Sequence, residues 1–223
     1  MVFSYLKRAS TLTLLSSLTS CAPTSTPIYP PQIDAQNFYL IANVTSNDLS
    51  PSINSYVVAS YHVGAGKDLA ILTPNVNPAS GRIFYVNGTS EEVYYGQSNV
   101  LSDEGTPPFA AGVSIASSTS NALLINAGVG QAGIGLTRFP DPITELYATG
   151  SEGFYACLSP ELGGGSAVQI FVQNGNDVPE SCARITLLPQ CSTEGSGLEH
   201  PDGNLINCYA DVAGIDWTVY NSD

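Results

Sequence analysis

Short runs of β-type residues alternate with Gly-, Pro- and Asn-rich turns from Asn37 almost to the end of the chain. Several runs alternate with a period of two, so that Val168, Ile170 and Val172 would share one face of a strand. No window of a dozen residues combines a sustained 3.6-residue period with helix-forming composition. The pattern therefore predicts an all-β protein.

The runs divide into principal strands and shorter additional segments. The principal strands are predicted at Asn37–Thr45, Ser55–Val63, Asp68–Thr73, Arg82–Asn87, Asn121–Asn126, Glu145–Gly150, Gly153–Leu158, Ser166–Gln173 and Ser181–Pro189. The additional segments are Glu92–Tyr95, Ala111–Ile115, Gly133–Leu136, Leu205–Tyr209 and Asp216–Tyr220. About a dozen short strands separated by turns are typical of a single antiparallel β-sandwich or sandwich-like barrel, which is the expected fold.

Two of the principal strands lead into the dipeptide Asn-Gly, at Asn87-Gly88 and at Asn174-Gly175. This dipeptide favours tight hairpins because both of its residues accept a positive φ angle. We therefore expect the chain to turn back on itself at both places.

The first 22 residues have the pattern of a secretory signal peptide. Lys7 and Arg8 precede a short apolar run, Leu12–Leu18, and Ser20–Ala22 offers small residues for cleavage. The alternatives are a bacterial lipoprotein signal with a lipidated Cys21 and an ordinary amphipathic first helix. The apolar run is far shorter than the roughly 20 residues that span a bilayer. We therefore expect a secreted protein, extracellular or in the cell wall, with no membrane attachment after signal removal.

Three parts are predicted after the signal. Residues 23–36 read as a Pro-rich, unfolded leader, residues 37–191 as the β-domain, and residues 192–223 as a C-terminal extension tied on by a disulfide. A chain of this size buries roughly 70% of its unfolded surface, which is enough for one core.

Charge excludes several classes of protein. The 223 residues carry 19 Asp and Glu against 6 Lys and Arg, giving a formal charge of −13, and only 11% of residues are charged. A nucleic-acid-binding protein would carry a basic stripe instead, and a coiled coil would be rich in Lys, Arg and Glu. The 43% hydrophobic content is too high for a disordered chain.

Four cysteines remain once Cys21 leaves with the signal: Cys157, Cys182, Cys191 and Cys208. In an exported protein they are expected to form two disulfides, for which three pairings exist. Cys182 and Cys191 lie nine residues apart along one predicted strand, roughly 30 Å, so they cannot bridge if the strand is real. Pairing 157–182 with 191–208 is preferred, and 157–191 with 182–208 stays open.

Two N-glycosylation sequons support a eukaryotic secretory route, Asn43-Val44-Thr45 and Asn87-Gly88-Thr89. We expect Asn87 to be the more fully glycosylated of the two. It would lie at a hairpin tip, whereas Asn43 lies inside a strand.

No catalytic or cofactor-binding residue can be nominated from the sequence. His62, in a predicted strand, and His200, in a loop, are the two histidines that could serve as a base, and no G-x-S-x-G motif accompanies them. Gly64–Asp68 superficially resembles a phosphate loop but lacks its first glycine and its Ser or Thr. It is predicted to be a glycine turn.

Metal and sugar ligands are equally unassigned. The loops Ser102–Gly105, Asn174–Asp177 and Pro201–Asn204 hold oxygen ligands that Ca²⁺ could use, but the same residues dominate ordinary turns. Two Tyr-rich stretches, SYVVASY and EEVYYGQ, could stack on sugars or simply pack in strands. We therefore expect no metal and no cofactor.

The segments SYHVGAGKDLAILTP, GRIFYVNGT, LLINAGVGQAGIGL, GFYAC and CARITLLPQC together carry a resemblance to known proteins. Over about residues 37–192 the chain resembles a family of uncharacterised secreted proteins of filamentous ascomycete fungi. More distantly, the GVGQAGIG element and the following cysteines are similar to phialide-type cell-wall proteins. The resemblance implies a secreted, wall-associated or host-facing protein without assigned chemistry.

The leading hypothesis is a non-enzymatic secreted glycoprotein of the fungal cell wall or of a host-facing surface. Its expected partner is cell-wall polysaccharide or a host protein, and not nucleic acid. The alternatives are a carbohydrate-binding module and a small secreted hydrolase.

Overall fold

The structure, a computed structural model, describes residues 29–75, 80–116, 120–160, 162, 167–175, 178–201 and 203–220. The expected signal peptide, residues 1–22, and residues 23–28 of the expected leader lie outside this part of the chain. Within it, the protein is nearly all-β, as the alternating pattern predicts.

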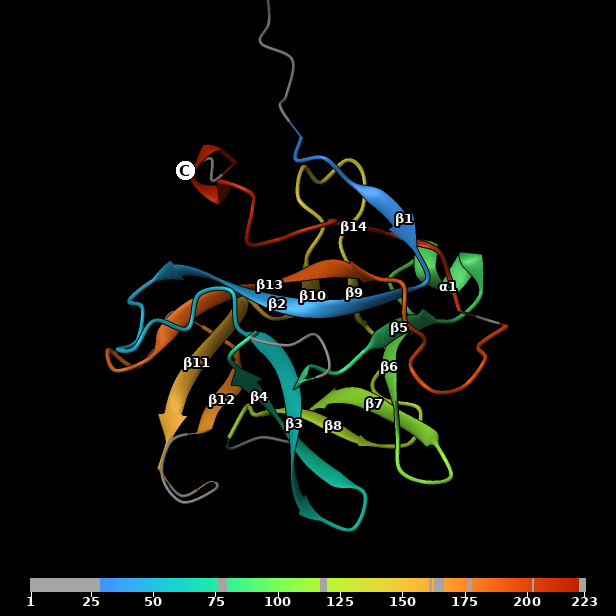
Figure 1. Ribbon diagram of the computed structural model, residues 1–223, viewed down its shortest axis with the longest axis horizontal. Helices are drawn as coiled ribbons and strands as arrows, with labels where there is room; N and C mark the ends of the chain where they lie inside the picture. The colour runs from blue at the N-terminus through green and yellow to red at the C-terminus, as the bar shows by residue number, and fades with distance from the viewer. Residues whose placement is uncertain are drawn as a thin grey trace, which may run out of the picture.

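The strands and helices are numbered as in Figure 1. The strands are β1 (Ile33–Ala35), β2 (Asn37–Ser46), β3 (Val57–Gly64), β4 (Lys67–Thr73), β5 (Phe84–Asn87), β6 (Asn99–Glu104), β7 (Phe109–Ile115), β8 (Leu123–Ala127), β9 (Ile134–Leu136), β10 (Leu146–Ala148), β11 (Gly153–Ser159), β12 (Ala167–Gln173), β13 (Ala183–Ser192) and β14 (Ile206–Cys208). The helical elements are α1 (Ser90–Tyr94) and the 3₁₀ helix η2 (Trp217–Val219).

The main sheet is antiparallel and closed. Its strand order is β12-β11-β13-β2-β3-β4-β8-β7-β6-β5, and further pairings join β12 to β4 and β2 to β5. Nine strands thereby form a barrel, while β3 pairs with both β2 and β4 as an additional strand. The antiparallel all-β expectation is thus correct, and the arrangement is a closed barrel rather than two separate sheets.

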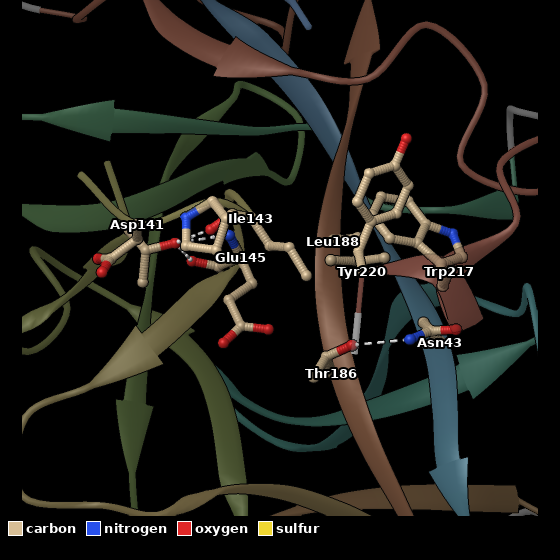
Figure 2. Close-up of a pocket in the computed structure, with 10 residues that line it drawn as sticks. Asn43, Asp141, Ile143, Glu145, Thr186, Leu188, Trp217 and Tyr220 are labelled. Atoms are coloured by element: carbon tan, nitrogen blue, oxygen red, sulfur yellow. Dashed lines mark hydrogen bonds between the residues drawn. The ribbon is translucent and has the colours of Figure 1, made fainter. Parts of the chain in front are cut away.

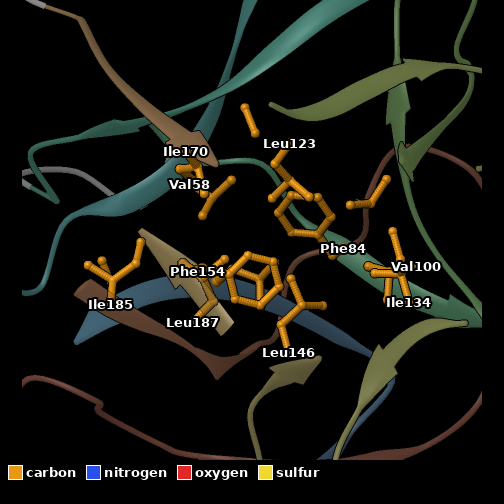
Figure 3. Packing of buried hydrophobic residues seen from close by; sticks show 14 of the residues in the cluster. Val58, Phe84, Val100, Leu123, Ile134, Leu146, Phe154, Ile170, Ile185 and Leu187 are labelled. Carbon is orange, nitrogen blue, oxygen red and sulfur yellow. The ribbon is translucent and has the colours of Figure 1, made fainter. Parts of the chain in front are cut away.

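Inward-facing side chains of the barrel strands and of the additional strand β3 form the main core. Val58, Phe84, Val100, Leu123 and Ile170 come from five different strands and meet in its interior (Figure 3). In β12 the three alternate residues predicted to share a face are all buried in this core. Period-two alternation is therefore what directs each strand toward the interior.

A second apolar cluster lies on the outer face of the barrel. Side chains of β2, β3 and β13 that point outward are covered there by the C-terminal extension. The buried members are Tyr39, Ile41, Val57, Leu188, Tyr209, Val212 and Trp217. The extension is therefore packed onto the barrel and does not hang from it by a disulfide alone.

The residues just before the barrel differ from the expected unfolded leader. Ile33–Ala35 form β1, which pairs with β14 of the extension, and Figure 1 shows the two together above β2 and β13. The physical reason is that the extension offers a strand edge to pair with, which the local Pro-rich composition could not reveal.

Two additional segments predicted as strands are helical instead. The segment Glu92–Tyr95 falls largely in α1, because Thr89 and Glu92 form a capping box at the start of the helix. The segment Asp216–Tyr220 contains η2, since the Asp216 side chain accepts a hydrogen bond from the Thr218 backbone N–H. Local capping thus outweighs β propensity at both places.

The two Asn-Gly hairpins are also corrections. The chain leaves β5 at Asn87 but reaches its partner, β6, only after α1. Asn174-Gly175 follows β12, whose neighbours are β11 and β4 and not the next strand, β13. At Asn87 the connection to the partner strand is lengthened by α1, whereas at Asn174 the positions beside β12 are filled by β11 and β4.

The disulfides join Cys157 to Cys182 and Cys191 to Cys208, with Cα atoms 4.5 and 5.2 Å apart. This is the pairing preferred from the sequence, and β13 runs almost the whole way from Cys182 to Cys191. The second disulfide fastens β14 to the end of β13.

Candidate functional site

A pocket of about 420 Å³ opens on the outside of the barrel, between β2, β13, the β9–β10 loop and the end of the extension (Figure 2). It is lined by Asn43, Thr137, Asp141, Pro142, Ile143, Glu145, Thr186, Leu188, Trp217 and Tyr220. We call it the loop–extension pocket. Its volume is in the range of small-molecule sites.

Aromatic side chains form one wall of the pocket. Trp217 and Tyr220 project from the short η2 turn, with ring centroids 6.1 Å apart and a tilt of 57°. Trp217 also contacts Tyr209 edge-on at 4.9 Å and donates a hydrogen bond from Nε1 to the Val212 carbonyl. These contacts fix the indole ring at the rim.

Carboxylates form the opposite wall. Asp141 and Glu145 belong to the β9–β10 loop, which Thr137 holds in shape. The Thr137 hydroxyl donates to the Ile143 carbonyl at 2.8 Å and accepts from the Glu145 backbone N–H at 2.9 Å. Burial, and secondly the nearby Asp141 charge, raises the pKa of the Glu145 carboxyl.

The floor is made by two strands that pair directly. Asn43 of β2 lies opposite Thr186 of β13, and its Nδ2 donates to the Thr186 hydroxyl at 3.2 Å. The pocket therefore combines an aromatic wall, two carboxylates and an amide–hydroxyl pair.

A second pocket, of about 390 Å³, lies on the other side of the same loop and shares Thr137 and Asp141 with the first. Its lining includes Tyr94, which is 73% exposed, and Phe139, which is 83% exposed. Tyr95 stands edge-on to Tyr94 at 5.1 Å. We call it the helix–loop pocket.

The two Tyr-rich stretches separate in the structure. In EEVYYGQ, Tyr94 and Tyr95 are the exposed aromatic residues at the end of α1. In SYVVASY, Tyr56 packs against the main core. Tyr94 and Tyr95 are thus exposed on the surface, whereas Tyr56 contributes to the packing of the core.

Among the lining residues, the sequence analysis did not single out the aromatic and acidic ones as site residues: Phe139, Asp141, Glu145, Trp217 and Tyr220. For Phe139 the available signal is a large aromatic side chain in a turn-rich segment outside the predicted strands. The sequence also shows a single tryptophan, which marks the end of the extension.

His62 belongs to a polar cluster away from these pockets. Its Nδ1 lies 2.9 Å from Oδ1 of Asp68, which is 2% exposed, and ligand atoms of His62, Asp68 and Glu104 lie within 4.8 Å of one another. These three side chains could hold a cation. Arg82 already brings a positive charge to the cluster, however, through an Nη2–Oε2 contact of 3.1 Å with Glu104.

His200 fastens the extension to the barrel. Its Nε2 lies 2.8 Å from Oδ2 of Asp103 and 3.1 Å from Oγ of Ser196, and its ring stacks on Tyr85 at 3.6 Å. A nucleophilic triad needs the acid and the serine on opposite ring nitrogens. Here both contact Nε2, so the arrangement is not that of a triad.

The same contacts assign a role to one proposed calcium loop. Within Ser102–Gly105, Oδ2 of Asp103 accepts hydrogen bonds from the Leu198 backbone N–H and the Ser196 hydroxyl in addition to its contact with His200. The carboxylate therefore holds the extension. In the other two loops, Asn176, Asp177 and Asp202 lie outside the described residues.

The glycine-rich turn and the second sequon are ordinary parts of the fold. Gly64–Asp68 makes the turn between β3 and β4, with Gly66 at φ +64°, as predicted. Asn87 ends β5, and its sequon threonine, Thr89, caps α1.

Comparisons with known proteins place the chain in a family. The model of a family described as a domain of unknown function, DUF7907, matches residues 35–191. A curated relative, "Antigenic protein SchS34" of Stachybotrys chartarum, is 36% identical over 216 residues, covering 87% of this chain and 95% of that protein. No solved structure matches.

Among the described residues, none of the helices has the length and apolar character needed to cross a membrane. The resemblance to an uncharacterised family from filamentous ascomycetes is confirmed by the relative and by the family match. Because that match covers more than half of the chain, this protein belongs to the DUF7907 family.

Proposed function

We propose that this protein is a secreted glycan-binding protein of the fungal cell wall or of a host-facing surface. A polysaccharide chain would lie across the loop–extension pocket and the helix–loop pocket. The observation that carries the proposal is that both pockets flank one loop, share Thr137 and Asp141, and each display aromatic rings beside polar groups.

The chemistry of the two pockets suits sugars. A pyranose ring presents C–H groups on its faces and hydroxyls at its edge, so it fits an aromatic surface flanked by hydrogen-bonding groups. Tyr220 and Phe139 supply rings on either side of the loop, and Asp141 supplies acceptors between them. Neutral sugars also avoid the repulsion that a protein of charge −13 exerts on anionic ligands.

Secretion is supported by independent features. The two disulfides are typical of proteins that mature in an oxidising compartment. The curated relative is named an antigenic protein, which fits exposure of a related protein outside the cell. The expected signal peptide and sequons agree with this route.

One observation favours a second function, glycan hydrolysis. Glycosidases use two carboxyl groups, one with a raised pKa that donates a proton. Glu145 has a raised pKa and lies near Asp141. Release of new reducing ends from polysaccharide, lost in a Glu145→Gln variant, would indicate hydrolysis instead of binding alone.

Retention on washed chitin and β-glucan in about 0.5 M salt tests the proposal, because stacking contacts resist salt whereas surface electrostatics are screened. We expect wild-type protein to be retained, and a Phe139→Ala/Tyr220→Ala variant to lose at least ~10-fold in affinity, which is about 1.4 kcal/mol. Phe109→Ala is the matched control, since Phe109 is an exposed aromatic residue outside both pockets.

Two results would overturn the proposal. One is wild-type protein that washes off both polysaccharides. The other is a control variant, Phe109→Ala, that loses as much affinity for polysaccharide as the double variant. The aromatic residues of the pockets would then contribute no more to binding than an exposed aromatic residue elsewhere.

A further inference from the structure

We propose that an N-glycan on Asn43 occupies the loop–extension pocket and excludes an external glycan from it. Glycosylation at this one residue would then set the fraction of the protein that can bind polysaccharide. The expected loss of polysaccharide binding rests on the proposed function, whereas the docking of the Asn43 glycan in the pocket is tested independently of it.

The first step of the argument is the position of the sequon asparagine. Asn43 is a lining residue of the loop–extension pocket, and it shares the outward-facing parity of Tyr39 and Ile41 in β2. Figure 2 shows its amide directed at Thr186, with Trp217 and Tyr220 on the same side of the pocket and Glu145 across from them. The atom that would carry the sugar therefore already lies at the pocket floor.

The second step is the bond itself. Oligosaccharide transfer replaces one of the two Nδ2–H bonds of Asn43 by a bond to C1 of the first N-acetylglucosamine, and the pyrophosphate-linked lipid carrier leaves and takes up the proton. The remaining N–H can still donate to the Thr186 hydroxyl, which is 3.2 Å from Nδ2 in the unmodified chain. The modified asparagine can thus keep its place in the sheet.

The third step is the fit of the first sugars. A pocket of about 420 Å³ holds a group the size of a disaccharide. The aromatic wall of Trp217 and Tyr220 suits the acetyl group and the C–H face of the ring. The carboxyl groups of Asp141 and Glu145 suit the sugar hydroxyls. A glycan tethered within the pocket also has a high effective concentration there, so a free chain competes poorly.

The second sequon provides the contrast. Asn87 lines neither the loop–extension pocket nor the helix–loop pocket. A glycan on Asn87 should therefore leave both pockets open. Only the sugar on Asn43 is expected to act on binding.

The test uses full-length protein secreted from a glycosylating host, with site occupancy measured by peptide mass mapping. Thr45→Ala removes the first sequon but keeps Asn43, and Thr45 does not line the loop–extension pocket. Asn87→Gln removes the second sequon as the matched control. We expect the Asn43-glycosylated fraction to bind chitin or β-glucan at least ~10-fold more weakly than Thr45→Ala protein, and Asn87→Gln to change nothing.

A second readout separates docking of the glycan from the proposed function. Trp217 is the single tryptophan of the chain, so its fluorescence reports on this pocket alone. We expect the Asn43-glycosylated fraction to show less acrylamide quenching than Thr45→Ala protein, and trimming to one N-acetylglucosamine to preserve the difference.

The outcomes distinguish the two claims. An Asn43 that stays unmodified, or a glycan that leaves Trp217 quenching unchanged, overturns the inference. Protected Trp217 together with a Thr45→Ala variant that binds no polysaccharide supports docking of the glycan and overturns the proposed function.

Discussion

Removing the Cys191–Cys208 disulfide, by changing both cysteines to alanine, should loosen the extension before the barrel. The bridge closes a loop with a sequence separation of 17 residues, and the chain-entropy model gives about 3 kcal/mol for a loop of this length. In a domain of this size, 1 kcal/mol shifts the melting temperature by roughly 2–4 °C. The expected decrease in melting temperature is therefore about 6–12 °C.

The extension would keep its other attachments in this variant. Asp103 still accepts hydrogen bonds from the 196–200 segment, and Tyr209, Val212 and Trp217 stay buried against the barrel. We thus expect a folded protein in which hydrogen exchange accelerates first in β14 and η2. Mass-spectrometric hydrogen exchange, with a Cys157→Ala/Cys182→Ala variant as control, measures this directly.

Two results would refute the reasoning. Exchange that accelerates equally in β2 and β13 would show that the disulfide stabilises the whole barrel and not the extension. A melting temperature within a degree or two of wild type would show that the remaining contacts already restrict the unfolded chain, so that the bridge removes little entropy.

Three further outcomes are expected. Because burial raises the pKa of Glu145, the folded state is stabilised by the protonated carboxyl below the usual pKa of 4.5, and this stabilisation is lost as the pH rises through the raised pKa. Glu145→Gln should therefore raise the melting temperature at pH 7.5 more than at pH 4. In Gly112→Ala the new Cβ would lie 2.1 Å from the Gly130 backbone nitrogen. The free energy of unfolding, measured by thermal unfolding, should therefore fall by roughly 1–3 kcal/mol. N-terminal sequencing of secreted protein should begin near Pro23, and a sequence that still starts at Met1, or at a lipidated Cys21, would contradict the predicted signal.

Strand positions were largely predictable from the sequence because the period of two is a local property. In the predicted strand Ser181–Pro189, the alternate residues Ala183, Ile185 and Leu187 all lie in the main core. Which strand pairs with which is not local. Phe38 lies opposite Cys191, and the sequence around either residue contains nothing that predicts this pairing.

The two pockets were less predictable, for a related reason. Trp217 and Tyr220 gather beside Glu145 only because the extension folds back over β2 and β13. In the sequence, Glu145 begins one predicted strand and Trp217 and Tyr220 belong to another, and no motif links the two segments. The exposed tyrosines of EEVYYGQ were noticed because adjacent tyrosines are visible in the sequence itself.

The pairing of β2 with β13 also sets when the protein can fold. The strands lie at opposite ends of the barrel sequence, and their register runs from Asn37 opposite Ser192 to Ser46 opposite Arg184. During synthesis β2 has no β13 partner until nearly the whole chain has emerged, and such non-local pairing is intrinsically slow. Through that interval Asn43 lacks its partner Thr186 in β13 and stays accessible to the glycosylation machinery. Translation and export speed would thereby influence how many molecules leave the cell with that residue modified.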